Sequence, residues 1–111
     1  MKNGTGHFVA QRVTAVALIV LGLWFGVAVS GLEIRDYGIV VAFVAEPLNI
    51  VLLTVLCTTL AYHSYLGIQV VIEDYVHGPS VKGASLVASK IAHVLVASLS
   101  TYAILTVGLG A

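Results

Sequence analysis

Three long apolar stretches alternate with short polar segments along the chain. The stretches run from Val13 to Ser30, from Leu48 to Ile72 and from Ala84 to Gly110. A membrane-spanning helix needs about 20 consecutive, mostly apolar residues, so each stretch can span a bilayer when its flanks are added. The pattern predicts an all-α membrane protein of one domain, residues 1–111, whose three transmembrane helices cover about residues 10–31, 47–73 and 83–109.

The segments between the stretches indicate where the helices end. Pro47 suits the first turn of a helix, because the N–H that it lacks would have no partner there. Gly78-Pro79 is a stop-and-turn signal after the second stretch. The apolar segment at residues 39–45 is too short to span, so it lies at the interface or begins the next helix. The first stretch is longer than the roughly 7–15 apolar residues of a signal peptide, and we interpret it as a retained helix.

Lysine and arginine residues are divided unequally between the two sides of the predicted bundle. The N-terminal flank and the loop before the third helix share one side and carry Lys2, Arg12 and Lys82, with Lys90 close by. The loop on the other side carries only Arg35. Because positive residues favour the inner side of a membrane, we predict that the N-terminus lies on the cytoplasmic side.

Composition supports a membrane location and excludes several classes of function. Of the 111 residues, 59% are hydrophobic and 9% are charged, whereas an average soluble domain has about 25% charged residues. The formal net charge is zero, so the chain lacks a basic surface for nucleic acid. It contains no glycine-rich phosphate loop, no H-E-x-x-H and no nucleophile elbow. The single cysteine, Cys57, cannot form an intrachain disulfide and is interpreted as a lipid- or core-facing side chain.

The segment from His63 to Tyr75 places polar groups inside and at the end of the second stretch. His63, Gly67 and Asp74 fall on one stripe of a helix, with His63 and Asp74 roughly 16 Å apart along its axis. An ionisable residue inside a membrane is a functional hypothesis, because its desolvation is costly. A neutral imidazole binds iron well, so His63 is a candidate axial haem ligand, with Gly67 removing bulk beside the macrocycle. The alternative is a structural histidine that is hydrogen-bonded to a helix neighbour.

Asp74 and Tyr75 lie where the second stretch reaches the predicted membrane boundary. An aromatic belt and a solvated helix end are one interpretation of this pair. A quinone site is the other, because quinone reduction takes up protons and the quinone carbonyls need hydrogen-bond donors near a proton source. Tyr75 can donate to a carbonyl, and Asp74 can orient a partner cation or relay protons. Position alone leaves both interpretations open.

His93 lies about as far beyond the second loop as His63 lies before it. In an antiparallel hairpin the two histidines reach similar depth, so a haem held within this one chain remains an alternative. His93 also belongs to a small-polar stripe with a spacing of four residues, which is typical of helix packing. The members of this stripe are Ser85, Ser89, His93 and Ala97. We interpret His93 as structural, and His7 and His77 as solvated or interfacial.

The pattern His63-x3-Gly67-x6-Asp74-Tyr75, late in the second of three membrane helices, resembles a known family. It is similar to the hydrophobic membrane-anchor subunit of succinate dehydrogenase (respiratory complex II). Residues 7–15 (HFVAQRVTA) are similar to the start of that family, in which an arginine precedes a Thr-Ala pair leading into the first helix. His93 is not part of the family pattern.

The resemblance implies roles for four residues. His63 is expected to supply one axial ligand to the iron of haem b, and the cytochrome b556 membrane subunit to supply the other. Tyr75 is expected to hydrogen-bond ubiquinone, and Asp74 to order that quinone site. Arg12 is expected near the haem propionates and the quinone region.

The resemblance also implies the setting in which the chain works. As a membrane-anchor domain with no catalysis of its own, it is expected to pack with the cytochrome b556 partner, another three-helix protein, and to anchor the flavoprotein and iron–sulfur subunits. That places it in electron transport and the tricarboxylic acid cycle, in the inner membrane of a bacterial cell rather than of a mitochondrion. Two alternatives remain: a self-contained small cytochrome b with an intrachain haem between His63 and His93, and a haem-free structural membrane subunit.

Overall fold

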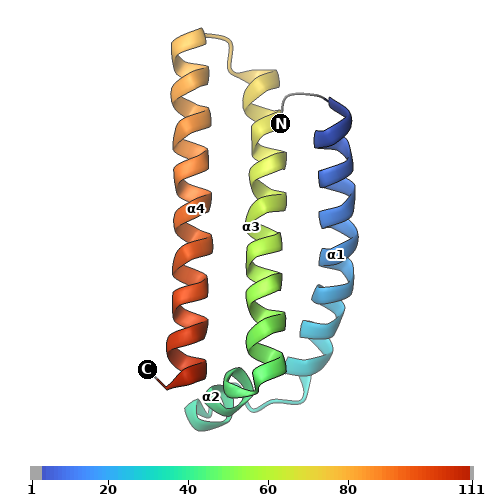
Figure 1. Ribbon diagram of the computed structural model, residues 1–111, viewed down its shortest axis with the longest axis vertical. Helices are drawn as coiled ribbons and strands as arrows, with labels where there is room; N and C mark the ends of the chain where they lie inside the picture. Colours follow the sequence, from blue (N-terminus) through green and yellow to red (C-terminus); the bar gives the residue numbers. More distant parts are fainter. Residues whose placement is uncertain (1–3, 111) are drawn as a thin grey trace.

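The computed structural model describes residues 4–110, which form four helices (Figure 1). They are α1 (Gly4–Ser30), α2 (Tyr37–Ala45), α3 (Pro47–Tyr75) and α4 (Pro79–Leu109). Three of them, α1, α3 and α4, are long and apolar enough to cross a membrane. No strand occurs within residues 4–110. The prediction of an all-α protein with three candidate membrane spans is confirmed.

Two of the long helices begin with a proline in the first turn. Pro47 starts α3 and Pro79 starts α4, because proline has no N–H to leave unpaired there and its φ already suits a helix. The third span therefore begins at the Gly78-Pro79 turn itself rather than near residue 83. The first span also begins earlier than predicted, at Gly4 rather than near residue 10.

The short apolar segment before Pro47 forms a helix of its own, α2. Asp36 caps its N-terminus, since the side-chain Oδ1 accepts a hydrogen bond from the backbone N–H of Ile39 at 3.2 Å. Glu46 separates α2 from α3 in an extended conformation (φ −60°, ψ 125°), as a residue before proline prefers. Asn49 Nδ2 then donates to the carbonyl oxygen of Phe43 at 2.9 Å and holds the corner between α2 and α3.

The helix α3 is the centre of the arrangement, because α1 and α4 both pack against it and α1 makes no contact with α4 in the described part of the chain. The N-terminal end of α1 and the α3–α4 connection lie at one end of the molecule, and α2 lies at the other (Figure 1). The predicted placement of the N-terminal flank and the second loop on one side is thus confirmed.

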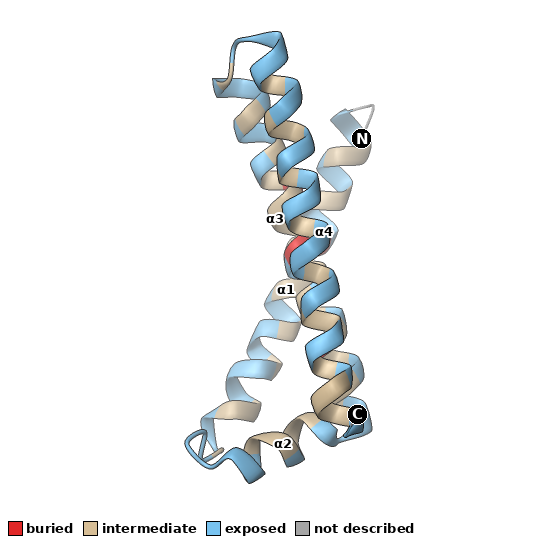
Figure 2. Ribbon diagram, turned by 90° about the vertical axis from the view of Figure 1, so that its left-hand side faces the viewer, coloured by how far each residue is buried: buried red, intermediate tan, exposed pale blue. Residues whose placement is uncertain are grey.

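Few side chains are buried within the chain itself. They are Thr14, Leu53, Ala61 and Leu66, and Figure 2 shows buried residues where α1 crosses α3. Most large apolar side chains stay exposed. Lipid tails are as apolar as leucine, so apolar contact adds little to helix association in a membrane, and close approaches and hydrogen bonds between helices matter more.

Candidate functional site

Within residues 4–110, hydrogen bonds from His7 and Thr14 join α1 to α3 where the helices cross. His7 Nε2 donates to the carbonyl oxygen of Leu66 at 3.2 Å. Further into the membrane segment, Thr14 Oγ1 lies 2.8 Å from His63 Nδ1. His7 is half-buried and bonded to α3, so it is not fully solvated, whereas His77 is exposed.

His63 thus lies at the α1–α3 crossing with its two ring nitrogens in different situations. Nδ1 contacts the Thr14 hydroxyl, and Nε2 has no hydrogen-bond partner within residues 4–110. The imidazole is half-buried. A histidine that binds a metal through one nitrogen usually has the other held by a hydrogen bond, which fixes the ring. His63 has this arrangement, so the residue predicted as a haem ligand fits that group.

Gly67, one turn beyond His63, also faces α1. A Cβ atom at this position would lie 3.7 Å from Gln11 Nε2, which is ordinary van der Waals contact. The packing of this chain therefore does not require a glycine here. The predicted role of Gly67 in leaving room for a macrocycle depends on a bound group and not on the approach of α1.

Arg12 leaves α1 on a different side from Thr14. Two residues along a helix correspond to a rotation of about 200°, so the two side chains start from nearly opposite faces. The guanidinium carbon of Arg12 lies 5.1 Å from the centroid of the Phe8 ring, a cation–π contact. The side chain is exposed and forms no ion pair within the described residues. The structure therefore does not bring Arg12 and His63 together.

His93 has partners for both of its nitrogens. Nδ1 donates to the Ser89 carbonyl oxygen at 2.7 Å, and Nε2 accepts from the Ser64 hydroxyl at 3.0 Å. The imidazole also meets the Tyr65 ring edge-on, with centroids 5.8 Å apart. His93 lies in the α3–α4 contact, whereas His63 faces α1, so the two histidines occupy different helix contacts. The geometry does not form the intrachain haem clamp.

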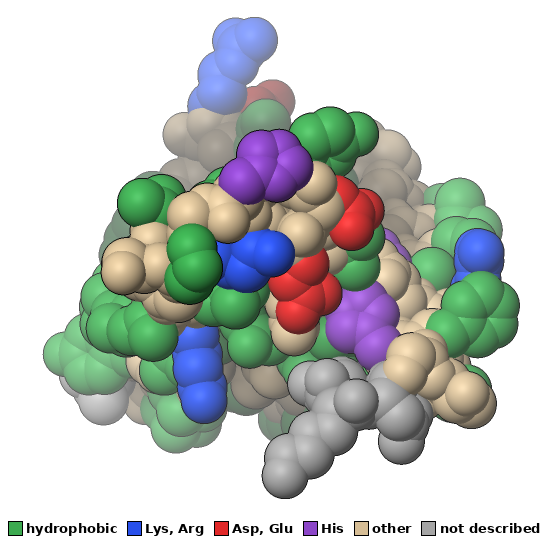
Figure 3. Space-filling model, turned by 90° about the horizontal axis from the view of Figure 1, so that it is seen from above, with side chains coloured by type: hydrophobic (Ala, Val, Ile, Leu, Met, Phe, Trp, Pro, Cys, Tyr) green, Lys and Arg blue, Asp and Glu red, His purple; other side chains and the backbone are tan. Residues whose placement is uncertain are grey.

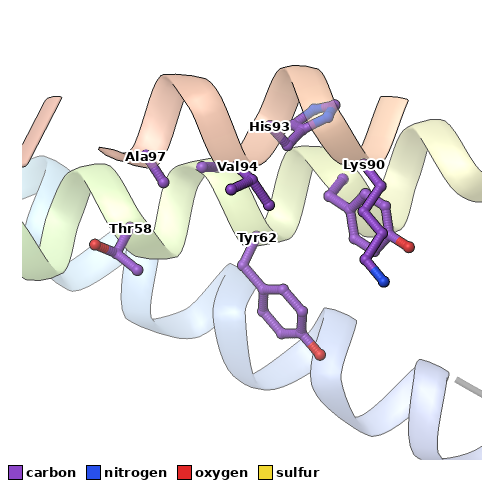
Figure 4. A pocket seen from close by; sticks show the side chains of 8 residues that line it. Thr58, Tyr62, Lys90, His93, Val94 and Ala97 are labelled. Atoms are coloured by element: carbon purple, nitrogen blue, oxygen red, sulfur yellow. The ribbon is translucent and has the colours of Figure 1, made fainter. Parts of the chain in front are cut away.

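Two cavities lie along the α3–α4 contact. The first, of about 230 Å³, is seen in Figure 4 with Tyr62 and Thr58 from α3 and Lys90, His93 and Ala97 from α4. The second, of about 280 Å³, shares His93 with it and is lined by Cys57 among others. Neither cavity contains His63, Asp74 or Tyr75. These two cavities are therefore separate from the residues of the predicted haem and quinone sites.

Asp74 and Tyr75 end α3 beside the connection to α4. Both are exposed, and Tyr75 is 75% accessible. Lys82 Nζ reaches back from α4 and donates to the Glu73 carbonyl oxygen at 3.2 Å. Figure 3 shows acidic, basic and histidine side chains gathered on this end of the molecule. The end of α3 thus offers a phenol and a carboxylate, both open to a ligand or a partner.

Sequence reasoning did not identify Thr14 as a partner of His63. The threonine was noted only as part of the Thr-Ala pair at the start of the first helix. Nothing in the sequence fixes how far α1 slides or rotates against α3, and that register decides which α1 side chain meets His63. The sequence does show that Thr14 is a polar residue in an otherwise apolar helix. Such a residue needs a hydrogen-bond partner when it is buried, so a partner on another helix could have been expected.

Several known proteins are similar to this chain over most of its length. The family model described as "Succinate dehydrogenase/Fumarate reductase transmembrane subunit" matches residues 1–104. The "Succinate dehydrogenase hydrophobic membrane anchor subunit" of Rickettsia bellii (strain RML369-C) is 32% identical over 94 residues, which cover 85% of this chain and 75% of the relative. The protein of the same name from Rickettsia prowazekii (strain Madrid E) is 33% identical over 90 residues, 81% of this chain and 72% of the relative. No solved structure matches the chain at a significant level.

Proposed function

This chain belongs to the succinate dehydrogenase/fumarate reductase transmembrane subunit family, and on that basis we propose that it is the membrane-anchor subunit of a bacterial succinate:quinone oxidoreductase. Its three long apolar helices support that role. In this proposal the chain has no catalysis of its own. It packs with a cytochrome b556 membrane partner and anchors the flavoprotein and iron–sulfur subunits at the inner membrane, with its N-terminus on the cytoplasmic side.

The observation that carries the cofactor part of the proposal is the geometry of His63. Its Nδ1 is held by Thr14 at 2.8 Å, and its Nε2 has no hydrogen-bond partner within residues 4–110. His63 would bind the iron of haem b through Nε2, and the cytochrome b556 partner would supply the second axial ligand. Haem b, when bound, supplies one-electron redox chemistry. One axial ligand comes from His63 in this proposal, so the haem would be shared between the two membrane subunits.

Tyr75 and Asp74 would form this chain's part of the ubiquinone site. The Tyr75 hydroxyl is exposed at the end of α3 and has no hydrogen-bond partner within residues 4–110, so it is available to donate to a quinone carbonyl. Asp74 precedes it on the same exposed end and would order the site. Because both side chains are exposed at the end of α3, the iron–sulfur and cytochrome b556 partners would complete the pocket.

Arg12 would bind carboxylates near these sites. Its guanidinium is exposed and has no carboxylate partner in the described residues, so it is free to meet the haem propionates or the quinone region of an assembled complex. Because Arg12 and His63 are not brought together here, this role needs a haem that extends beyond the α1–α3 contact.

Purification through a tag on this chain from its native membrane tests the proposal. Mass spectrometry should find the flavoprotein and iron–sulfur subunits, and a reduced-minus-oxidised spectrum should show a b-type haem. The substitution His63→Ala should perturb or abolish that spectrum, while His77→Ala, an exposed loop histidine, serves as the matched control and should leave it unchanged. A complex with no haem would favour the haem-free structural alternative. A haem unaffected by His63→Ala would remove His63 as a ligand.

A further inference from the structure

Thr14 is the one buried polar residue in the described part of the chain, with 9% of its surface accessible. A hydroxyl removed from water in an apolar helix is costly unless it is hydrogen-bonded. Thr14 Oγ1 has three close neighbours: the carbonyl oxygens of Ala10 at 2.8 Å and Gln11 at 3.1 Å, and His63 Nδ1 at 2.8 Å. The direction of these hydrogen bonds has a chemical consequence for His63.

A threonine hydroxyl has one proton to donate, and carbonyl oxygens can only accept. The proton of Thr14 therefore points to the Ala10 carbonyl, shared with that of Gln11, as threonine hydroxyls commonly do within a helix. The contact between Thr14 Oγ1 and His63 Nδ1 then needs a proton from the imidazole. With the Thr14 proton on the Ala10 carbonyl, the contact requires His63 to carry its proton at Nδ1, so that in the neutral ring Nε2 carries the lone pair.

We propose that Thr14 is a positioning residue that holds His63 as the Nδ1–H tautomer and so presents Nε2 as the metal-binding atom. This inference rests on the proposed function, in which His63 is a haem ligand. An acceptor on Nδ1–H fixes the tautomer and the ring orientation and makes the ligand more basic. Thr14 touches neither the haem nor the quinone in this scheme and acts only through the imidazole.

A purely structural role would give Thr14 the task of joining α1 to α3 and nothing more. Two substitutions separate the two roles. Thr14→Val keeps the shape of the side chain but removes the acceptor, whereas Thr14→Ser keeps the hydroxyl and removes a methyl group. If Thr14 only fills space between the helices, the serine variant, with its lost methyl group, should be the more disturbed; if its hydrogen bond only joins the helices, the valine variant should lose stability but keep the wild-type haem potential. If Thr14 orients His63, the valine variant should be altered and the serine variant should resemble the wild type.

The experiment compares the assembled complex carrying wild-type chain, Thr14→Val, Thr14→Ser or His63→Ala. The measurements are haem per complex, the midpoint potential of the haem and the electron paramagnetic resonance spectrum of its ferric form. We expect Thr14→Val to weaken haem retention by about 10- to 100-fold, the usual effect of losing a hydrogen-bond partner of a metal ligand. The midpoint potential should rise, because a less basic imidazole stabilises the ferric state less. Thr14→Ser should restore both values.

A second measurement reads the tautomer directly and does not need haem. Nitrogen-15 NMR of the full chain, labelled at histidine and reconstituted in lipid bilayers, distinguishes a protonated from an unprotonated ring nitrogen, and the spectrum of a His63→Gln variant identifies the signals of His63. The wild type should show a proton on Nδ1 and none on Nε2. A proton on Nε2 of the wild type would overturn the inference, even if the valine variant fails to fold.

The outcomes also separate this inference from the proposed function. If His63→Ala loses the haem while Thr14→Val keeps the wild-type potential and haem content, the ligand stands and the role of Thr14 is wrong. If His63→Ala keeps an unaltered haem spectrum, the ligand assignment itself is wrong, and with it the role of Thr14 toward haem.

Discussion

An added methyl group at Gly108 should disturb the packing of α4 against α2 and α3. A Cβ atom there would lie 2.9 Å from both Cδ1 and Cγ1 of Ile50 and 3.2 Å from the carbonyl oxygen of Val44. Carbon atoms pack best at about 3.5–4.0 Å, so α4 would have to move away from α2 and α3. Overpacking of this kind costs about 1–3 kcal/mol, and we expect Gly108→Ala to lower the free energy of unfolding by that amount relative to a matched control.

Gly83→Ala is that control, because Gly83 also lies in α4 and no atom lies within 4 Å of its added Cβ. Both substitutions gain the helix propensity of alanine, worth about 1 kcal/mol in water, so the difference between them isolates the steric term. Trp24, the only tryptophan, stacks on Phe43 of α2 with ring centroids 6.3 Å apart. Its fluorescence during chemical denaturation of the purified chain in lipid bicelles therefore reports the packing around α2.

Equal stability of the two alanine variants would refute the steric reasoning. A double-mutant cycle sharpens the test, because Ile50→Ala removes the two closest carbon contacts of Gly108→Ala. The two substitutions should then be coupled by about 0.5–3 kcal/mol, the range found for residues in contact. The contact to the Val44 carbonyl oxygen remains in the double variant, so part of the penalty should persist. Additive effects would mean that Ile50 moves aside without cost.

Two further predictions concern the proposed sites. Tyr75→Phe should slow quinone reduction by the complex about 2- to 10-fold, since one neutral hydrogen bond of about 0.5–1.5 kcal/mol is lost, and it should leave the haem spectrum intact. Tyr37→Phe, at the opposite end of the molecule and similarly exposed, is its control, and equal rates for both variants would count against the site. His93→Ala should retain the b-type haem spectrum, because both nitrogens of His93 already have partners. It should lower the free energy of unfolding by about 1 kcal/mol through the lost hydrogen bond to Ser64. Loss of haem in this variant would support the alternative of a haem held between His63 and His93.

The long apolar stretches were enough to predict the three spans, because a bilayer demands length and hydrophobicity and little else. The preference of proline for the first turn of a helix was enough to predict that α3 starts at Pro47. It did not reveal that α2 is a separate helix, although the cause is local: Glu46 precedes proline and takes an extended conformation. The early start of α1 at Gly4 was missed, because its first turns are polar and resemble a flank.

Part of the candidate site was predictable from the polar residues that interrupt the apolar stretches. His63 stood out because an ionisable residue inside an apolar stretch is rare, and so did His93. The small-polar stripe favoured a structural His93, and its bond to the Ser89 carbonyl oxygen agrees with that interpretation, but the partner helix of each histidine was not predictable from its distance to the loop. The difference comes from rotation about the helix axis: His63 faces α1, while Ser64, the next residue, meets His93. A rotation of 100° per residue is known from geometry, but which face meets which neighbour depends on the packed structure.

Thr14 and His63 are 49 residues apart, so in N-terminal-first synthesis α1 is made well before the helix that carries its partner. The hydroxyl of Thr14 is hydrogen-bonded before α3 is made, because its proton is bonded to the Ala10 carbonyl oxygen within α1. If His63 carries its proton at Nδ1, as proposed, that N–H meets an acceptor on α1, which is already in the membrane when α3 inserts. His93 likewise brings its own acceptor, the Ser89 carbonyl oxygen, from one turn earlier in α4. The three helices can therefore insert into the bilayer one after another. At each step the Thr14 hydroxyl proton and the Nδ1–H groups of His63 and His93 have an acceptor.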